Sequence, residues 1–216
     1  SLGGAMNLHE TLLAMGDRAV AAARDLAGLD TAAKNGMLRL MASALRDRRA
    51  EIQAANGVDM ETGRAAGLAP AMLDRLLLTD ARIEAMARGL EEVAALPDPV
   101  GATLAAWTRP NGLRIRKVRV PIGVIAIIYE SRPNVTADAA ALCFKSANAV
   151  LLRGGREAAA SNRAIAAVLR AGGAAGGMPR DAIQLVESLD REAVGELVRM
   201  TGRVDLAIPR GGEGLI

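Results

Sequence analysis

The sequence predicts an α/β fold, in which a doubly wound parallel sheet follows an all-helical amino-terminal layer and a basic edge strand. Residues 7–96 place apolar side chains at helical spacing throughout. Residues 123–129 and 149–152 are apolar without alternation, which is typical of parallel strands covered on both faces. After Pro121, strand and helix patterns alternate strictly, and such alternation produces right-handed crossovers and a parallel sheet.

The segment 7–96 predicts four helices rich in alanine, leucine and arginine. Asn7 and Glu10 have the spacing of a capping box at the start of the first helix. Glycine, aspartate, proline or threonine interrupts the apolar rows, and the predicted breaks fall at 28–31, Gly57, 63–70 and Thr79.

The helical block ends at residues 97–101, and the segment 113–120 then alternates apolar with basic residues. Its apolar positions are Ile115, Val118 and Val120, and its basic positions are Arg114, Arg116, Lys117 and Arg119. The pattern predicts an exposed strand, and basic side chains on an edge strand protect a sheet against mispairing. A surface for an acidic partner or for self-association is the alternative.

The rest of the chain predicts a regular series of strands and helices. Strands are expected at 123–129, 149–153, 183–187 and 204–208, and helices at 136–145, 157–169 and 191–200. A glycine-rich link at 172–177 precedes the third strand. These patterns divide the chain into a cloning remnant at 1–5, a helical part at 6–112, an edge or oligomerisation strand at 113–120 and a parallel α/β core at 121–216.

The amino-acid composition argues against several kinds of partner and site. The formal net charge is +3 and the charges alternate in sign along the helices, which does not favour nucleic acid as a partner. Only Trp107, Tyr129 and Phe144 are aromatic, so a platform for stacking the bases of single-stranded nucleic acid is not expected. One cysteine and one histidine provide neither an intrachain disulfide nor a cluster of metal ligands, which fits a reducing cytoplasm. Because no apolar run reaches about 18 residues and no signal pattern is found, we expect no membrane contact.

Three predicted turns follow strands at the same edge of the sheet and outline a cleft, at 130–134, 153–157 and 209–214. Two of these turns place an arginine before two glycines: Arg153, Gly154, Gly155 and Arg210, Gly211, Gly212. A fixed cation beside residues that let the backbone approach closely suits a phosphorylated ligand. The common nucleotide-binding motifs are missing from the sequence. The two RGG triplets do not indicate an RNA-binding box, because they cap buried strands without interleaved aromatic residues.

Three motifs make the resemblance to one family specific. They are YESRPNVT at 129–136, LCFKSANAVLLRGGREA at 142–158 and VDLAIPRGGEGLI at 204–216. In this order they resemble the γ-glutamyl phosphate reductases, also called glutamate-5-semialdehyde dehydrogenases, which belong to the aldehyde dehydrogenase superfamily. The resemblance runs from Met6 to the end of the chain and implies an aldehyde dehydrogenase-like cofactor domain.

The resemblance implies reduction of γ-glutamyl phosphate with NADPH to glutamate 5-semialdehyde and phosphate, the second step of proline biosynthesis. In this family a cysteine thiolate carries the acyl group before hydride transfer. Family members continue into a further domain that supplies this cysteine, so the resemblance covers their amino-terminal portion and implies that the chain alone is inactive. Cys143 does not match that cysteine, and its place among alanines in a predicted helix indicates a buried, unreactive thiol.

The resemblance assigns one catalytic candidate in this chain, Asn134. It matches the superfamily asparagine whose side-chain amide stabilises the developing oxyanion. The alternative role is a helix cap near Thr136, since asparagine before a helical run commonly caps it. The two roles are compatible.

The same resemblance implies a set of cofactor-binding residues: Ile128, Tyr129, Glu130, Ser131, Arg153, Gly154, Gly155, Arg156, Arg210, Gly211 and Gly212. The first four match the segment that lines the cofactor ribose and pyrophosphate, and Arg153 matches a basic residue at the adenosine ribose. The last three match a turn that approaches the cofactor phosphates. Arg156 stands where NAD-using relatives have a carboxylate, so it implies NADPH rather than NADH.

Two other functions stay open. One is a different acyl-reducing relative of the aldehyde dehydrogenases, which the YESRPN and PRGG motifs disfavour. The other is a non-catalytic nucleotide-binding or interaction module of the same fold. The resemblance also allows a homo-oligomer, because a comparable hairpin takes part in subunit contacts in the family, and a functional contact with the glutamate kinase that makes the substrate.

Overall fold

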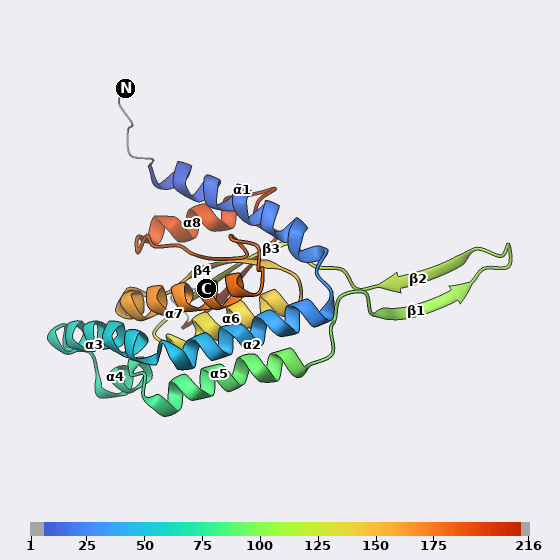
Figure 1. Ribbon diagram of the computed structural model, residues 1–216. Coiled ribbons are helices and arrows are strands. Elements are labelled where there is room, and N and C mark those ends of the chain that lie inside the picture. The colour runs from blue at the N-terminus through green and yellow to red at the C-terminus, as the bar shows by residue number, and fades with distance from the viewer. Residues whose placement is uncertain (1–6, 213–216) are drawn as a thin grey trace, which may run out of the picture.

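A four-stranded parallel sheet in the order β5–β4–β3–β6 forms the centre of the structure, a computed structural model that describes residues 7–212 (Figure 1). The strands are β3 Val124–Tyr129, β4 Ala149–Arg153, β5 Ile183–Leu185 and β6 Leu206–Arg210. Every residue of β3 and β4 is buried, which explains their nearly continuous apolar sequences. The predicted parallel sheet is therefore confirmed. The predicted cloning remnant at 1–5 lies outside the described residues.

Helices cover both faces of this sheet, as a doubly wound fold requires (Figure 1). α1 Leu8–Ala27 and α8 Arg191–Arg199 pack on one face. On the other face lie α6 Asn134–Lys145 and α7 Ala159–Ala175, with the 3-10 helix η1 Arg156–Ala158 leading into α7. In an outer layer, α2 Thr31–Asp47, α3 Arg49–Ala65 and α5 Asp80–Ala95 pack on α6 and α7, and α4 Pro70–Leu76 packs on α3. The predicted amino-terminal helices are thus divided between the two faces.

The amino-terminal segment forms α1 to α5, where the sequence predicts only four helices. The capping box at Asn7 and Glu10 is confirmed. The break predicted at Gly57 is wrong, because this exposed glycine lies inside α3, where it costs a helix little enough to be tolerated. The chain leaves the helical conformation at Arg48 instead, with φ −104° and ψ 24°. Arginine is a good helix former, so its identity does not mark this break.

A projecting hairpin contains the predicted basic strand. β2 Arg114–Val118 pairs antiparallel with β1 Thr103–Thr108, which lies in the range predicted to be helical. The connecting turn ends at Gly112 with φ +84°, a conformation that favours glycine. All of β1 is exposed, and the hairpin extends away from the body of the protein (Figure 1). The exposed basic strand is therefore confirmed as part of a separate two-stranded sheet, while its role in self-association stays a prediction.

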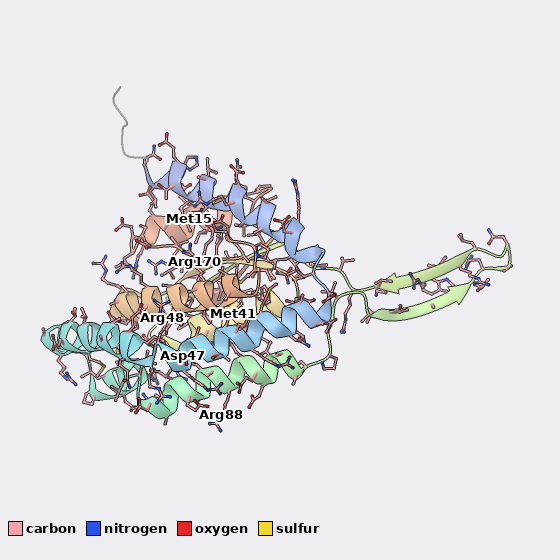
Figure 2. All side chains as sticks on the ribbon, viewed as in Figure 1. Met15, Met41, Asp47, Arg48, Arg88 and Arg170 are labelled. Carbon is pink, nitrogen blue, oxygen red and sulfur yellow. The ribbon has the colours of Figure 1, made fainter. Side chains whose placement is uncertain are left out.

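Several boundaries in the α/β core differ from those predicted. α6 begins at Asn134 instead of residue 136, β5 ends at Leu185 instead of 187, and β6 covers 206–210 instead of 204–208. α7 continues through the predicted glycine-rich link to Ala175, because its glycines allow close packing on α2. A Cβ atom on Gly172 would lie only 2.8 Å from Met41 Cα, and Figure 2 shows Met41 between α2 and α7.

Two buried lysines join the outer helices to α6. Lys34 Nζ on α2 lies 2.7 Å from an Asp98 carboxylate oxygen and donates to the Lys145 carbonyl at 3.1 Å. Lys145 Nζ in turn donates to the Ala94 carbonyl at 2.9 Å. Burial raises the pKa of Asp98, but hydrogen bonds from Lys34 and Thr31 outweigh it and hold that pKa below its ordinary value.

We expect Lys34→Met to lower the free energy of unfolding by about 3–5 kcal/mol, because it leaves the Asp98 carboxylate, whose side chain is 12% exposed, without its ion-pair partner. Urea denaturation followed by circular dichroism measures the change. The matched control is Arg48→Met, which removes the exposed pair with Glu51 and should cost less than about 1 kcal/mol. Equal losses for the two variants would contradict a structural role for the buried pair.

The chain's one cysteine, Cys143, lies on the buried side of α6 with 5% of its surface exposed. Burial raises the pKa of its thiol to about 12, so the reactive thiolate is scarce at neutral pH. The predicted buried thiol is confirmed.

Iodoacetamide is therefore expected to leave Cys143 unmodified in the native protein at neutral pH and to alkylate it after unfolding in concentrated urea. Intact-mass spectrometry over a time course distinguishes the two cases. Alkylation of the native protein at the rate of a free model thiol would show that the thiol is accessible.

Candidate functional site

The candidate site lies at the carboxyl edge of the sheet, where parallel α/β folds commonly bind ligands. Strand register brings the three predicted turns to this edge, since Ile128 lies opposite Arg153 and Tyr129 opposite Arg210. The Gly212 N–H donates to Glu130 Oε2 at 3.2 Å and so links the turn after β6 to the turn after β3. The last two residues of the predicted turn 209–214 lie outside the described residues.

Two hollows open at this edge. The β6 hollow has a volume of about 410 Å³, and its wall includes Tyr129, Glu130, Ser131, Arg210, Gly211 and Gly212. The α5 hollow has a volume of about 440 Å³, and its wall includes Leu77, Ala85, Met86, Asn134 and Asp138. Arg75 and Arg132 line both hollows. Six of the predicted cofactor residues therefore share one hollow, and the catalytic candidate lines the other.

Ser131 has a left-handed backbone with φ +46°, which is uncommon for a residue with a side chain. Glu157 stabilises this backbone conformation, because Glu157 Oε1 accepts hydrogen bonds from the Ser131 N–H at 2.6 Å and from the Ser131 hydroxyl at 2.8 Å. The same carboxylate occupies the space where a Cβ atom on Gly155 would lie. Only glycine at 155 leaves room for this contact, and sequence analysis missed the role of Glu157.

Tyr129 presents no free hydroxyl to a ligand. Its side chain is 1% exposed, and its hydroxyl lies 2.6 Å from Thr136 Oγ1, which donates to Asn162 Oδ1 at 3.0 Å. Burial raises the pKa of Tyr129 to about 12, so it stays protonated at neutral pH. A Cβ atom on Gly154 would overlap the Asn162 amide, so this glycine is required for the packing of β4 against α7. Ile128 is likewise buried.

The two arginines of the turn after β4 lie in different environments. Arg153 is buried, and its Nη atoms donate to the carbonyls of Gly154, Leu189 and Asp190 at 2.9–3.3 Å. Burial lowers its pKa from the ordinary arginine value. Arg156, by contrast, is exposed at the start of η1. The hydrogen bonds of Arg153 to backbone carbonyls therefore fix the turn, whereas Arg156 faces the solvent.

Asn134 is the first residue of α6 and is half-buried on the wall of the α5 hollow. Its Nδ2 donates to Asp138 Oδ2 at 3.0 Å, one helical turn along. The cap position belongs to Pro133, and no side chain caps the helix, so the predicted helix-capping role of Asn134 is wrong. Burial raises the pKa of Asp138, while the bond from Asn134 and the charge of Arg210 oppose the rise.

Sequence analysis missed Asp138 and Arg75. The spacing of Asn134 and Asp138, four residues apart on one helix, could have indicated their contact. No local pattern could have indicated Arg75, because α4 reaches this edge only through tertiary packing.

Neither a metal centre nor a membrane span is found within residues 7–212. No three histidine, cysteine or acidic side chains of this part gather closely enough to hold a metal ion. None of its helices combines the length and apolar character needed to cross a membrane.

The chain is similar in sequence to curated proteins named γ-glutamyl phosphate reductase. No protein-family model matches the chain. The γ-glutamyl phosphate reductase of Rhodospirillum rubrum is 59% identical over 95% of this chain and 48% of its own length. That of Paramagnetospirillum magneticum is 55% identical over 97% of this chain and 50% of its own length.

The solved structure of γ-glutamyl phosphate reductase from Thermotoga maritima superposes with a TM-score of 0.92 at 43% identity, over 94% of this chain and 49% of that one. The chain thus spans about half the length of the curated relatives it matches. The solved structure of a probable aldehyde dehydrogenase from Listeria monocytogenes shares the fold, with a TM-score of 0.76 at 13% identity over 97% of this chain and 43% of that one. Over that half, the chain is a homologue of the γ-glutamyl phosphate reductases and has an aldehyde dehydrogenase-like fold.

Proposed function

We propose that this chain is the amino-terminal, cofactor-binding portion of an enzyme that reduces γ-glutamyl phosphate with NADPH to glutamate 5-semialdehyde and phosphate. The reaction belongs to proline biosynthesis and takes place in the cytoplasm. The observation that carries the proposal is the position of Asn134 on the wall of the α5 hollow, held by the hydrogen bond that it donates to Asp138 of its own helix, in a chain homologous to these reductases. Because Cys143 is buried, the nucleophilic thiolate comes from another part of the enzyme.

Asn134 is suited to stabilise an oxyanion. Its amide has two N–H groups, and Asp138 accepts one of them. The other is left for the acyl oxygen of the substrate, which gains negative charge when the thiolate attacks the acyl carbon. A neutral donor whose direction is fixed before the reaction stabilises this charge with little reorganisation. Asp138 is then a positioning residue, since it acts through Asn134.

The β6 hollow fits the polar part of a dinucleotide. Glu130 offers a carboxylate to ribose hydroxyls, Arg210 offers a cation to phosphate oxygens, and a Cβ atom on Gly212 would meet nothing within 4 Å, which leaves the backbone accessible. When bound, the cofactor supplies the hydride that reduces the acyl group. Ser131 and Gly211 line the same hollow. The other predicted cofactor residues near it support its walls through packing and backbone contacts: Ile128, Tyr129, Arg153, Gly154 and Gly155.

In the complete enzyme, Asn134→Ala is expected to lower kcat by roughly 10²–10³-fold, the usual cost of removing one oxyanion donor. The dissociation constant for NADPH should stay within about twofold, because Asn134 does not line the β6 hollow. Steady-state kinetics and a cofactor fluorescence titration measure the two quantities. A variant with normal kcat would rule out the oxyanion role.

A matched pair of variants at Asp138 supplies the control. Asp138→Asn keeps an oxygen that can accept from Asn134 and should retain most of the activity, whereas Asp138→Ala removes the acceptor and should lower kcat. If both variants lost the same activity, the carboxylate charge and not the positioning of Asn134 would be the important property.

Arg156 is proposed to bind the 2′-phosphate of NADPH. Its guanidinium is exposed beside the turn after β4 and is free to pair with a dianion. Arg156→Ala should weaken NADPH binding by roughly tenfold and leave NADH binding unchanged, as expected for loss of a charge-assisted hydrogen bond.

Fluorescence titration of both cofactors tests this prediction. Arg170→Ala is the control, since Arg170 is an exposed arginine of α7 that lines neither hollow (Figure 2). An equal loss of NADPH and NADH affinity in the Arg156 variant would argue against recognition of the 2′-phosphate.

A further inference from the structure

We infer that Arg75 and Arg132 form the binding site for the phosphate group of the acyl phosphate, an inference that rests on the proposed function. Arg75 belongs to α4 and Arg132 to the loop between β3 and α6, so they lie 57 positions apart in the sequence. Both line the β6 hollow and the α5 hollow. They therefore stand between the proposed cofactor residues on one side and Asn134 on the other.

The charges around the two hollows leave these arginines available. Each carboxylate of the walls already has a partner: Asp74 pairs with Arg82 at 3.0 Å, Asp138 accepts from Asn134 at 3.0 Å, and Glu130 accepts from the Gly212 N–H at 3.2 Å. The side chains of Arg75 and Arg132 make no hydrogen bond or ion pair with another residue of the described part, 7–212. Two arginine side chains without a carboxylate partner are suited to a dianion.

The backbones that carry the two side chains are fixed. The Asn56 side chain binds the Leu76 carbonyl and the Leu78 N–H, both at 2.8 Å, and so holds the end of α4 next to Arg75. On the other side, the Arg132 N–H donates to the Glu130 carbonyl at 2.6 Å and the Arg132 carbonyl accepts the Val135 N–H at 3.1 Å. Only the side chains of Arg75 and Arg132 must move when a ligand binds. This limits the conformational entropy that the protein loses on binding.

The reaction needs cations at this place. When the cysteine of the complete enzyme loses its proton and its thiolate attacks the acyl carbon, the S–C bond forms and the bond from the acyl carbon to the phosphate oxygen breaks. The electron pair of the broken bond goes to the phosphate oxygen, the thiol proton also ends on phosphate, and the products are a thioester and HPO₄²⁻. Two guanidinium groups beside the leaving oxygens stabilise the charge that develops there.

The reverse reaction tests this inference, because it takes inorganic phosphate as a substrate separate from the aldehyde and NADP⁺. In the complete enzyme, Arg75→Met and Arg132→Met should each raise the KM for phosphate at least about tenfold, with the KM for NADP⁺ within about twofold. Arg64→Met, an exposed arginine of α3 outside both hollows, should change neither. Because Arg75 and Arg132 are also exposed, all three variants should keep the wild-type unfolding midpoint.

Two outcomes would overturn the inference. A KM for phosphate that stays unchanged would remove the site, and a rise confined to the KM for NADP⁺ would assign the arginines to the cofactor phosphates instead.

Direct binding separates this inference from the proposed function. If the wild-type enzyme did not turn over at all, the proposed function would fail. ³¹P nuclear magnetic resonance line broadening of inorganic phosphate by the wild-type protein, lost in the double variant Arg75→Met/Arg132→Met, would still support the anion site. Equal broadening by the wild type and the double variant would overturn it.

Discussion

Strand β3 is held at its amino end by two side chains that each stand immediately before a neighbouring strand. Asn148, before β4, accepts the N–H groups of Ile122 and Gly123 at 2.7 and 2.8 Å, and Asp205, before β6, accepts that of Val124 at 2.8 Å. Gly123 has φ +125°, and a side chain there would overlap the Asp205 carboxylate. A shift of one residue in the pairing of β3 with its neighbours would turn every side chain of the strand to the opposite face of the sheet. By fixing the register, these bonds also determine which residues end each strand. The candidate site at the carboxyl edge depends on this register.

The outer helices reach the same edge through a second set of buried polar contacts. Asp59 on α3 accepts the Ser161 N–H at 2.7 Å and the Ala160 N–H at 3.1 Å, and so caps the first turn of α7. Asn56, one helical turn earlier, donates to Ser161 Oγ at 3.0 Å and also holds the end of α4. Buried polar groups must be satisfied, so these bonds specify one placement of α3 and α4 against α7. Arg75 reaches the hollows from α4 through that placement.

The electrostatics of the site divide its charged residues into two groups. Arg153, Arg82 and Glu157 bind other groups of the protein, namely backbone carbonyls, the Asp74 carboxylate and the strained Ser131. Arg75, Arg132 and Arg210 line hollows that are open to solvent. Sequence alone cannot separate the two groups, because arginines followed by glycines look the same whether they are buried or exposed. Arg153 and Arg210 both precede two glycines, yet only Arg153 is buried.

The sequence by itself determined the elements whose signals are local. β3 and β4 followed from continuous apolar runs, the start of α1 from its capping box, and the buried state of Cys143 from its apolar neighbours. Only the tertiary structure decided the break at Arg48, the pairing of β1 with β2, the extension of α7 past Gly172 and the arrival of Arg75 at the site. The physical reason is that these features depend on contacts between residues distant in the chain, whose packing and hydrogen bonds outweigh local propensity.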